Sequence, residues 1–159
     1  MASASRTRRL ATDQSTSSWS SRAGATSRSC GSSKHYVREA LERWQGVEND
    51  TAGDGFYATF DGPARAIRCA LDIVNRVRDI GIEIRAGIHT GECEIVDGKH
   101  AGLAVTIGSR IAAIAGPSDV LVSRTVKDLT AGSAFSFDDM GEHELKGVPD
   151  PWHVHRVIA

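Results

Sequence analysis

The chain has 159 residues, of which 40% are hydrophobic and 25% charged, and its formal net charge is −1 at pH 7. This balance is ordinary for a globular protein and excludes non-specific nucleic-acid binding by the whole chain, which needs a basic surface. No apolar run reaches the roughly 20 residues that a membrane-spanning helix needs, so we expect no membrane insertion. Cys30, Cys69 and Cys93 lack disulfide or metal-ligand spacing, which favours a reduced, cytoplasmic compartment.

Residues 1–33 differ from the rest of the chain in composition. They contain eleven serines and five arginines against one acid, Asp13, and they show no apolar periodicity. Such a segment buries too little apolar area to offset its chain entropy, so we expect a disordered tail, followed by a folded domain over residues 34–159. Three interpretations of the tail stay open: a solvated extension, a transit peptide, or a substitute for a lost segment.

Beyond this tail, helical and strand patterns alternate. An apolar stripe at helical spacing predicts a helix over residues 35–44, and a strand pair follows over residues 47–60 with an Asp-Gly turn at its tip. Asp61 as the cap and Pro63 in the first turn are expected to open a second amphipathic helix, which Gly81 ends.

The second half continues the alternation. Residues 82–89 read as a half-buried strand, and residues 92–96 are predicted as its hairpin partner. A helix is expected over residues 103–115, with an inward face formed by Leu103, Ile107, Ile111 and Ile114. A strand at 120–122, a helix capped by Ser123 and a β-rich end complete an α+β pattern of helices packed on one sheet.

Asp54 is the first candidate for chemistry. It lies in the sequence Gly53-Asp54-Gly55, between two strand-like segments, which is typical of a hairpin turn. A carboxylate at a hairpin tip can reach a metal ion or a phosphate group, but most such turns have no role beyond the turn itself.

The segments that follow this turn narrow the choice by their order. They read IRAGIHTGE over residues 84–92, GLAVTIGSRIA over residues 102–112, VLVS over residues 120–123 and GEHELKGV over residues 141–148. Together with the turn, they resemble the catalytic domain of class III nucleotidyl cyclases of the bacterial adenylate/guanylate cyclase type. The resemblance covers about residues 35–157 and implies a ferredoxin-like, palm-type sheet with helices packed on it.

The resemblance also implies an activity and its partners. The family converts ATP or GTP to a cyclic nucleotide and pyrophosphate in intracellular signalling, with two divalent ions, Mg²⁺ or Mn²⁺, bridged by two carboxylates. Asp54 is by position the second of these metal carboxylates. Because the family's site is shared between two chains, the implied partner is a second copy in a homodimer or another cyclase domain.

Four further site residues follow from the same resemblance. Arg110 corresponds to the arginine that stabilises charge on phosphate, and Thr106, one turn earlier, replaces the more common asparagine that orients the ribose. Asp50 and Lys99 correspond to the base-selecting pair, with their charges reversed, so they do not indicate adenine over guanine. His153 and His155 share a strand face at a spacing compatible with a metal, but without a third ligand we interpret them as surface residues.

The first strand of the family, with its metal-binding Asp, is not recognisable. It is expected around residues 5–15, where Thr12-Asp13 is neither preceded nor followed by apolar residues. The fold is therefore predicted to be incomplete at its N-terminus, and the chain to be a weak or inactive cyclase. The alternatives are a non-catalytic module that pairs with a complete cyclase, a diguanylate cyclase-like palm, whose Gly-Gly-Asp-Glu-Phe turn is absent, or a remnant without a stable fold.

Overall fold

The computed structural model describes residues 15–21, 29–52 and 55–158. Asp54 lies outside this range, and so do the side chains of residues 15–21, 29–33 and 50–52. The elements are, in order, β1 (Ser15–Ser21), α1 (Ser29–Trp44), β2 (Val47–Ala52), β3 (Gly55–Phe60), α2 (Pro63–Arg78), β4 (Ile84–Thr90), β5 (Glu94–Val96), β6 (Lys99–Ala101), α3 (Leu103–Ile114), β7 (Val120–Ser123), α4 (Arg124–Leu129), β8 (Ser136–Glu144) and β9 (Pro151–Ile158).

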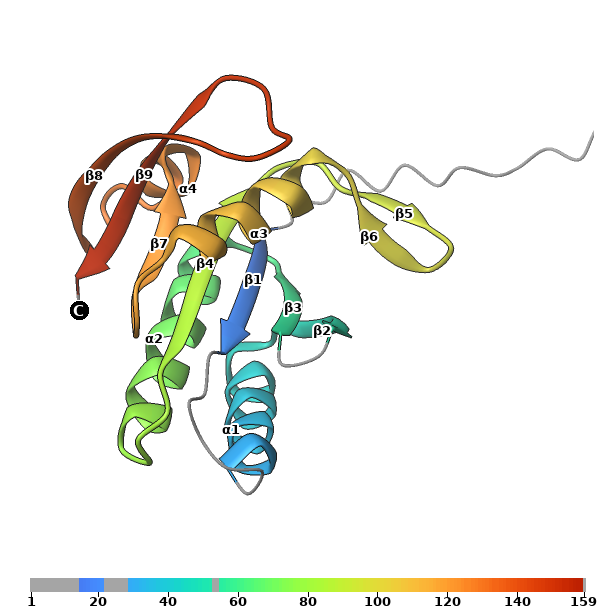
Figure 1. Ribbon diagram of the computed structural model, residues 1–159, viewed down its shortest axis with the longest axis vertical. Helices are drawn as coiled ribbons and strands as arrows, with labels where there is room; N and C mark the ends of the chain where they lie inside the picture. Colours follow the sequence, from blue (N-terminus) through green and yellow to red (C-terminus); the bar gives the residue numbers. More distant parts are fainter. Residues whose placement is uncertain (1–14, 22–28, 53–54, 159) are drawn as a thin grey trace, which may run out of the picture.

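Seven of these strands form one sheet in the order β2-β3-β1-β4-β7-β9-β8, and β5 and β6 form a separate hairpin (Figure 1). Only the pairing of β4 with β7 is parallel among the strand pairs of the described residues. Helices cover both faces of the sheet, which confirms the predicted α+β fold. On β4, Ile84, Ala86 and Ile88 belong to the core that contains α1 and α2, whereas the intervening Gly87 packs against α3.

The strand β1 is an interior strand, third in the order of the sheet, and its sequence STSSWSS is almost entirely polar. It pairs antiparallel with β3 on one side and with β4 on the other. The expected disorder over residues 1–33 is therefore wrong for Ser15–Ser21, and also for residues 29–33, which begin α1. The expected absence of the first strand is wrong as well. Backbone pairing on both sides satisfies the N–H and C=O groups of any residue, and apolar periodicity does not report this pairing.

The predicted hairpin partner of β4 is also wrong. Residues 94–96 form β5, which pairs with β6 and not with β4. Asp97 and Gly98 form the two-residue turn between them with φ angles of 51° and 77°. Positive φ at both positions is the geometry of a type I′ turn, which Asp-Gly favours. This turn pairs β5 with β6, so β5 does not become the hairpin partner of β4.

Two helix details differ from the sequence prediction. The N-cap of α2 is Gly62, and Asp61 instead forms an ion pair with Arg65 at 3.7 Å. On α3, Ile107 and Ile111 are buried as predicted, but Leu103 and Ile114 are 51% and 41% exposed. These two lie at the ends of the helix.

The helices α1 and α2 are joined by a polar contact at their common surface. The indole N–H of Trp44 donates to Oδ2 of Asp72 at 3.2 Å, and the Nε–H of Arg76 donates to Oδ1 at 2.8 Å. Below this contact, Ile67, Ile73 and other buried residues fill the main core. Among the described residues, no helix is long and apolar enough to cross a membrane.

Candidate active site

The close approach of α3 to β4 positions the candidate catalytic residues. A Cβ atom added at Gly87 would lie 2.2 Å from the amide nitrogen of Ala112 and 2.5 Å from the carbonyl oxygen of Gly108. No side chain fits at this distance, so glycine is required at position 87. The contact fixes the height of α3 above the sheet, and with it the positions of Thr106 and Arg110. A glycine within a strand of β-branched residues is the sequence signal for such an approach, and the sequence analysis did not use it.

Arg110 lies half-buried in the middle of α3. Its Nε atom is buried and has no hydrogen-bond partner among the residues that the structure describes. Leaving a buried donor unpaired costs about 1–3 kcal/mol, and a phosphate oxygen is a matched acceptor for a guanidinium N–H. Thr106 lies one turn earlier, and its hydroxyl donates to the carbonyl oxygen of Gly102 at 3.3 Å. Arg110 therefore has an unused donor for an anion, whereas the Thr106 hydroxyl is engaged with its own helix.

The hairpin that carries Asp54 is formed as predicted. Ala52 pairs with Gly55, and Gly53 and Asp54 lie between them in the sequence. The position of Asp54 as a metal ligand stays a prediction, because this residue lies outside the described range.

The predicted base-selecting residues lie on neighbouring strands. Asp50 is in β2, opposite Tyr57 of β3, and Lys99 opens β6, which contacts β2. The two strands are therefore close enough for the predicted pair to form. A contact between the Asp50 carboxylate and the Lys99 ammonium stays a prediction, because the side chain of Asp50 is not described.

The end of β1 nearest the hairpin tip lacks the carboxylate that a two-ion centre needs. Ser20 pairs with Gly55, and Ser21 follows it, so both lie beside the turn that holds Asp54. The sequence contains no Asp or Glu between Asp13 and Glu39. Neutral hydroxyls do not bridge two divalent cations as carboxylates do. Because the described residues at this end of β1 offer no carboxylate, they do not fit the two-ion centre of the cyclases.

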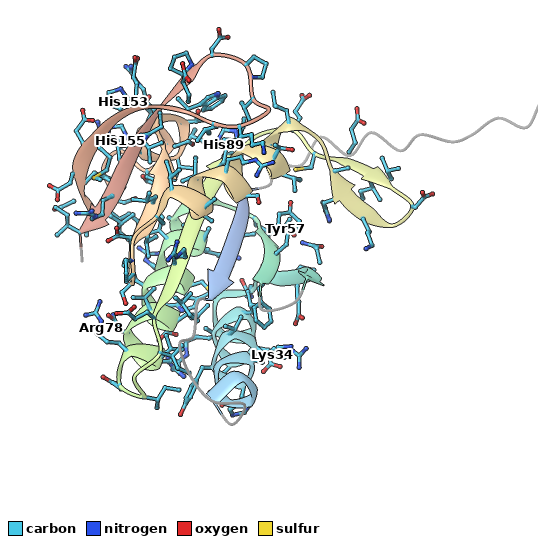
Figure 2. The ribbon with its side chains drawn as sticks, viewed as in Figure 1. Lys34, Tyr57, Arg78, His89, His153 and His155 are labelled. Atoms are coloured by element: carbon cyan, nitrogen blue, oxygen red, sulfur yellow. The ribbon has the colours of Figure 1, made fainter. Side chains whose placement is uncertain are left out.

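His89 is a buried residue near the carboxyl end of β4 (Figure 2), where it pairs with Thr16 at the start of β1, away from the hairpin tip. Its Nδ1 atom lies 2.8 Å from the hydroxyl oxygen of Ser123, and that oxygen also accepts the backbone N–H of Val126 at 3.4 Å. Its ring meets the edge of Trp152 at 5.1 Å between centroids. Burial lowers the pKa of His89 to about 4, so the ring is neutral at pH 7.

Comparison with known proteins gives one consistent family. The model of the adenylate and guanylate cyclase catalytic domain matches residues 34–158. An uncharacterized protein of Mycobacterium tuberculosis is 33% identical over 122 residues, which cover 74% of this chain and 42% of that protein. The chain thus spans about two fifths of the length of these mycobacterial relatives.

Solved structures agree with the sequence matches. The adenylyl cyclase CyaB of P. aeruginosa superposes with a TM-score of 0.83 at 16% identity, covering 92% of this chain and 94% of that one. The adenylate/guanylate cyclase/hydrolase of Silicibacter pomeroyi superposes with a TM-score of 0.77 at 27% identity, covering 92% and 98%. The family match over residues 34–158 and the shared fold lead to one conclusion: this chain belongs to the adenylate and guanylate cyclase catalytic domain family.

Proposed function

We propose that this chain is a cyclase domain that contributes the phosphate-binding half of a nucleotide site shared with a second cyclase domain, and that alone it turns over ATP or GTP weakly or not at all. The observation that carries the proposal is the serine end of β1 beside the hairpin, where the family's first metal carboxylate is expected. The unpaired Nε–H of Arg110 supports the other half of the proposal, because it is a donor prepared for an anion.

The assignments of single residues follow from this division. Arg110 binds a phosphate of the nucleotide and stabilises the charge that develops there, a role in which loss of a donor costs on the order of 10²–10³ in rate. Thr106 lies beside it on α3 and contacts the ribose if its hydroxyl leaves Gly102. Asp50 and Lys99 contact the base, and Asp54 is the remaining acidic ligand for Mg²⁺ or Mn²⁺. ATP and GTP are both compatible with these groups.

The partner that this arrangement fits is a cyclase domain that keeps both metal carboxylates.

Signalling in the cytoplasm is consistent with the free thiols of Cys69 and Cys93. Residues 34–159 form the cyclase-like part of the chain in this proposal, to which β1 adds the strand between β3 and β4.

A complementation experiment tests the proposal without a foreign partner. The unmodified chain is assayed with ATP and with GTP in the presence of Mn²⁺, and is expected to be silent or nearly so. A carboxylate is then introduced beside the hairpin as Ser20→Asp or Ser21→Asp. Because successive strand residues point to opposite faces, one of the two variants places its carboxylate on the face of Asp54.

The second arm of the experiment separates the two halves of the site. The active carboxylate variant is combined with Arg110→Ala, which removes its own phosphate-binding half. This double variant is expected to be inactive alone and to regain turnover when it is mixed with the unmodified chain, which supplies Arg110. Robust turnover by the unmodified chain alone would overturn the proposal.

A self-contained homodimeric cyclase is the second candidate function. It is favoured by the intact hairpin around Asp54, which a chain without any catalytic role has no need to keep. The assay of the unmodified chain distinguishes the two candidates, because only a self-contained enzyme turns over ATP or GTP there. That turnover should then be lost in Asp54→Asn.

A further inference from the structure

Three metal-ligating side chains meet on the ribbon formed by β8 and β9, at the end of the sheet away from the hairpin. They are Asp139 of β8 and His153 and His155 of β9 (Figure 2). One ligand atom from each residue lies within 4.8 Å of the ligand atoms of the other two. The third ligand that the sequence analysis did not find for the two histidines is therefore provided by the neighbouring strand.

The local structure explains why these side chains share one face. His153 and His155 are two residues apart on β9, and their rings stack with centroids 4.9 Å apart. Asp139 lies directly opposite His155 in the ladder. A bulge follows, in which β8 has one residue more than β9 before Glu142 pairs with His153. The bulge brings the Asp139 carboxylate beside both histidines, and it contacts Nε2 of His153 at 2.5 Å.

His155, one of the three residues of the cluster, has a buried ring nitrogen, Nδ1, without a hydrogen-bond partner among the described residues. The residue as a whole is 4% exposed. Burying an unpaired polar atom is costly, so native structures rarely keep one without a water or an ion to satisfy it. This atom is the observation that separates the cluster from a chance grouping of surface residues.

We propose that Asp139, His153 and His155 bind a transition-metal ion of the Zn²⁺ class, with the fourth position open to solvent. Two imidazoles and one carboxylate are a ligand set that Zn²⁺, Ni²⁺ and Co²⁺ accept and that Mg²⁺ does not prefer. Ligand atoms about 2.0–2.2 Å from a tetrahedral ion lie about 3.4 Å from one another. The cluster therefore closes by small side-chain rotations, which the largely exposed Asp139 can make without moving the strands.

This site is separate from the nucleotide site. In the order of the sheet, β8 forms one edge, whereas β2, beside the hairpin of Asp54, forms the other. An ion on the ribbon would tie β8 to β9 across the bulge. The proposal therefore does not rest on the proposed cyclase function, and a cyclase assay does not test it.

Binding of Zn²⁺ and Co²⁺ to the full-length, tag-free, metal-stripped chain tests the proposal. Calorimetry with Zn²⁺ is expected to show one site per chain, and Co²⁺ is expected to give the intense visible absorption of a tetrahedral complex. Asp139→Asn and His153→Gln are expected to weaken Zn²⁺ binding at least about tenfold, because even partners outside the ligand shell are worth about 10- to 100-fold. Both residues are partly or largely exposed, so these variants keep the fold.

Matched controls locate the ion. Asp138→Asn changes the carboxylate of the neighbouring residue, which lies opposite Arg156 in the strand ladder, and His35→Gln changes an exposed histidine on α1. Both controls are expected to bind Zn²⁺ as the unmodified chain does, and so is Asp54→Asn. Equal affinity in Asp139→Asn and Asp138→Asn would overturn the proposal, as would loss of binding in Asp54→Asn alone. Failure of the unmodified chain to bind Zn²⁺ or Co²⁺ would also overturn it.

Discussion

The hydroxyl of Ser123 is hydrogen-bonded to the buried ring of His89. Its oxygen lies 2.8 Å from Nδ1 of His89 and also accepts the backbone N–H of Val126 at 3.4 Å. The same serine caps α4, as the sequence predicted, and so one side chain joins the end of β4 to the start of α4.

This relationship predicts a loss of stability in mild acid. The pKa of His89 is about 4 in the folded protein and 6.5 ordinarily, so between these pH values the unfolded chain binds more protons than the folded one. The free energy of unfolding should therefore fall as pH decreases from about 6.5 to about 4, by up to about 3 kcal/mol. Urea unfolding at a series of pH values measures this change.

The control for this prediction is His89→Gln, which cannot titrate. Its stability should depend less on pH over the same interval, even if it is lower throughout. If the variant and the unmodified chain lose the same free energy between pH 6.5 and pH 4, His89 is not the responsible group.

Gly87→Ala should disrupt the packing of α3 on the sheet. The new methyl group would overlap the backbone of Ala112 and Gly108, so the helix has to move away from β4. Overpacking of this kind costs about 1–3 kcal/mol. We expect a lower thermal midpoint and, in the active carboxylate variant of the complementation experiment, a loss of turnover through displacement of Arg110. Gly62→Ala is the comparison, because a Cβ there meets no atom within 4 Å; equal effects of both substitutions would argue against the packing explanation.

Asp72→Asn should loosen the contact between α1 and α2. The Asp72 carboxylate accepts hydrogen bonds from Trp44 and Arg76, and Arg43 lies 3.5 Å from its Oδ2 atom. Its side chain is 18% exposed, so loss of its charge leaves these donors poorly paired, at a cost of about 1–3 kcal/mol. Chemical denaturation measures the change. Asp79→Asn, at the end of the same helix, should have a much smaller effect, and a similar loss in both variants would show that helix charge matters more than this contact.

Removal of β1 should convert the fold into a self-associating one. Deletion of residues 1–21 leaves the facing edges of β3 and β4 without a partner, and unpaired strand edges bind other chains. Size-exclusion chromatography is expected to show oligomers or aggregates. Deletion of residues 1–14 alone keeps β1 and should leave the elution volume of the intact chain unchanged. If the chain without residues 1–21 were a stable monomer, β1 would be dispensable.

The sequence predicted the parts of the fold in which local signals and burial agree. The helix over Pro63–Arg78 and the hairpin of β2 and β3 are examples, because apolar spacing and turn residues indicate the same elements. β1 was missed because a run of serines has no apolar period, and its place is decided by β3 and β4. For the cluster on the β8–β9 ribbon, the sequence indicated the two histidines by their spacing. It did not indicate Asp139, whose place beside them depends on the register of the β8–β9 ladder.

The position of β1 has a consequence for the order of folding. Ser17 pairs with Ala58 and with Ile88, so the centre of the sheet forms only when segments tens of residues apart meet. Closing such loops is entropically costly, and a polar strand adds little apolar driving force to offset that cost. The hairpin of β2 and β3 and the helix α2 involve local contacts and can form earlier. We therefore expect β1 to enter between β3 and β4 late, as the slow step that completes the domain.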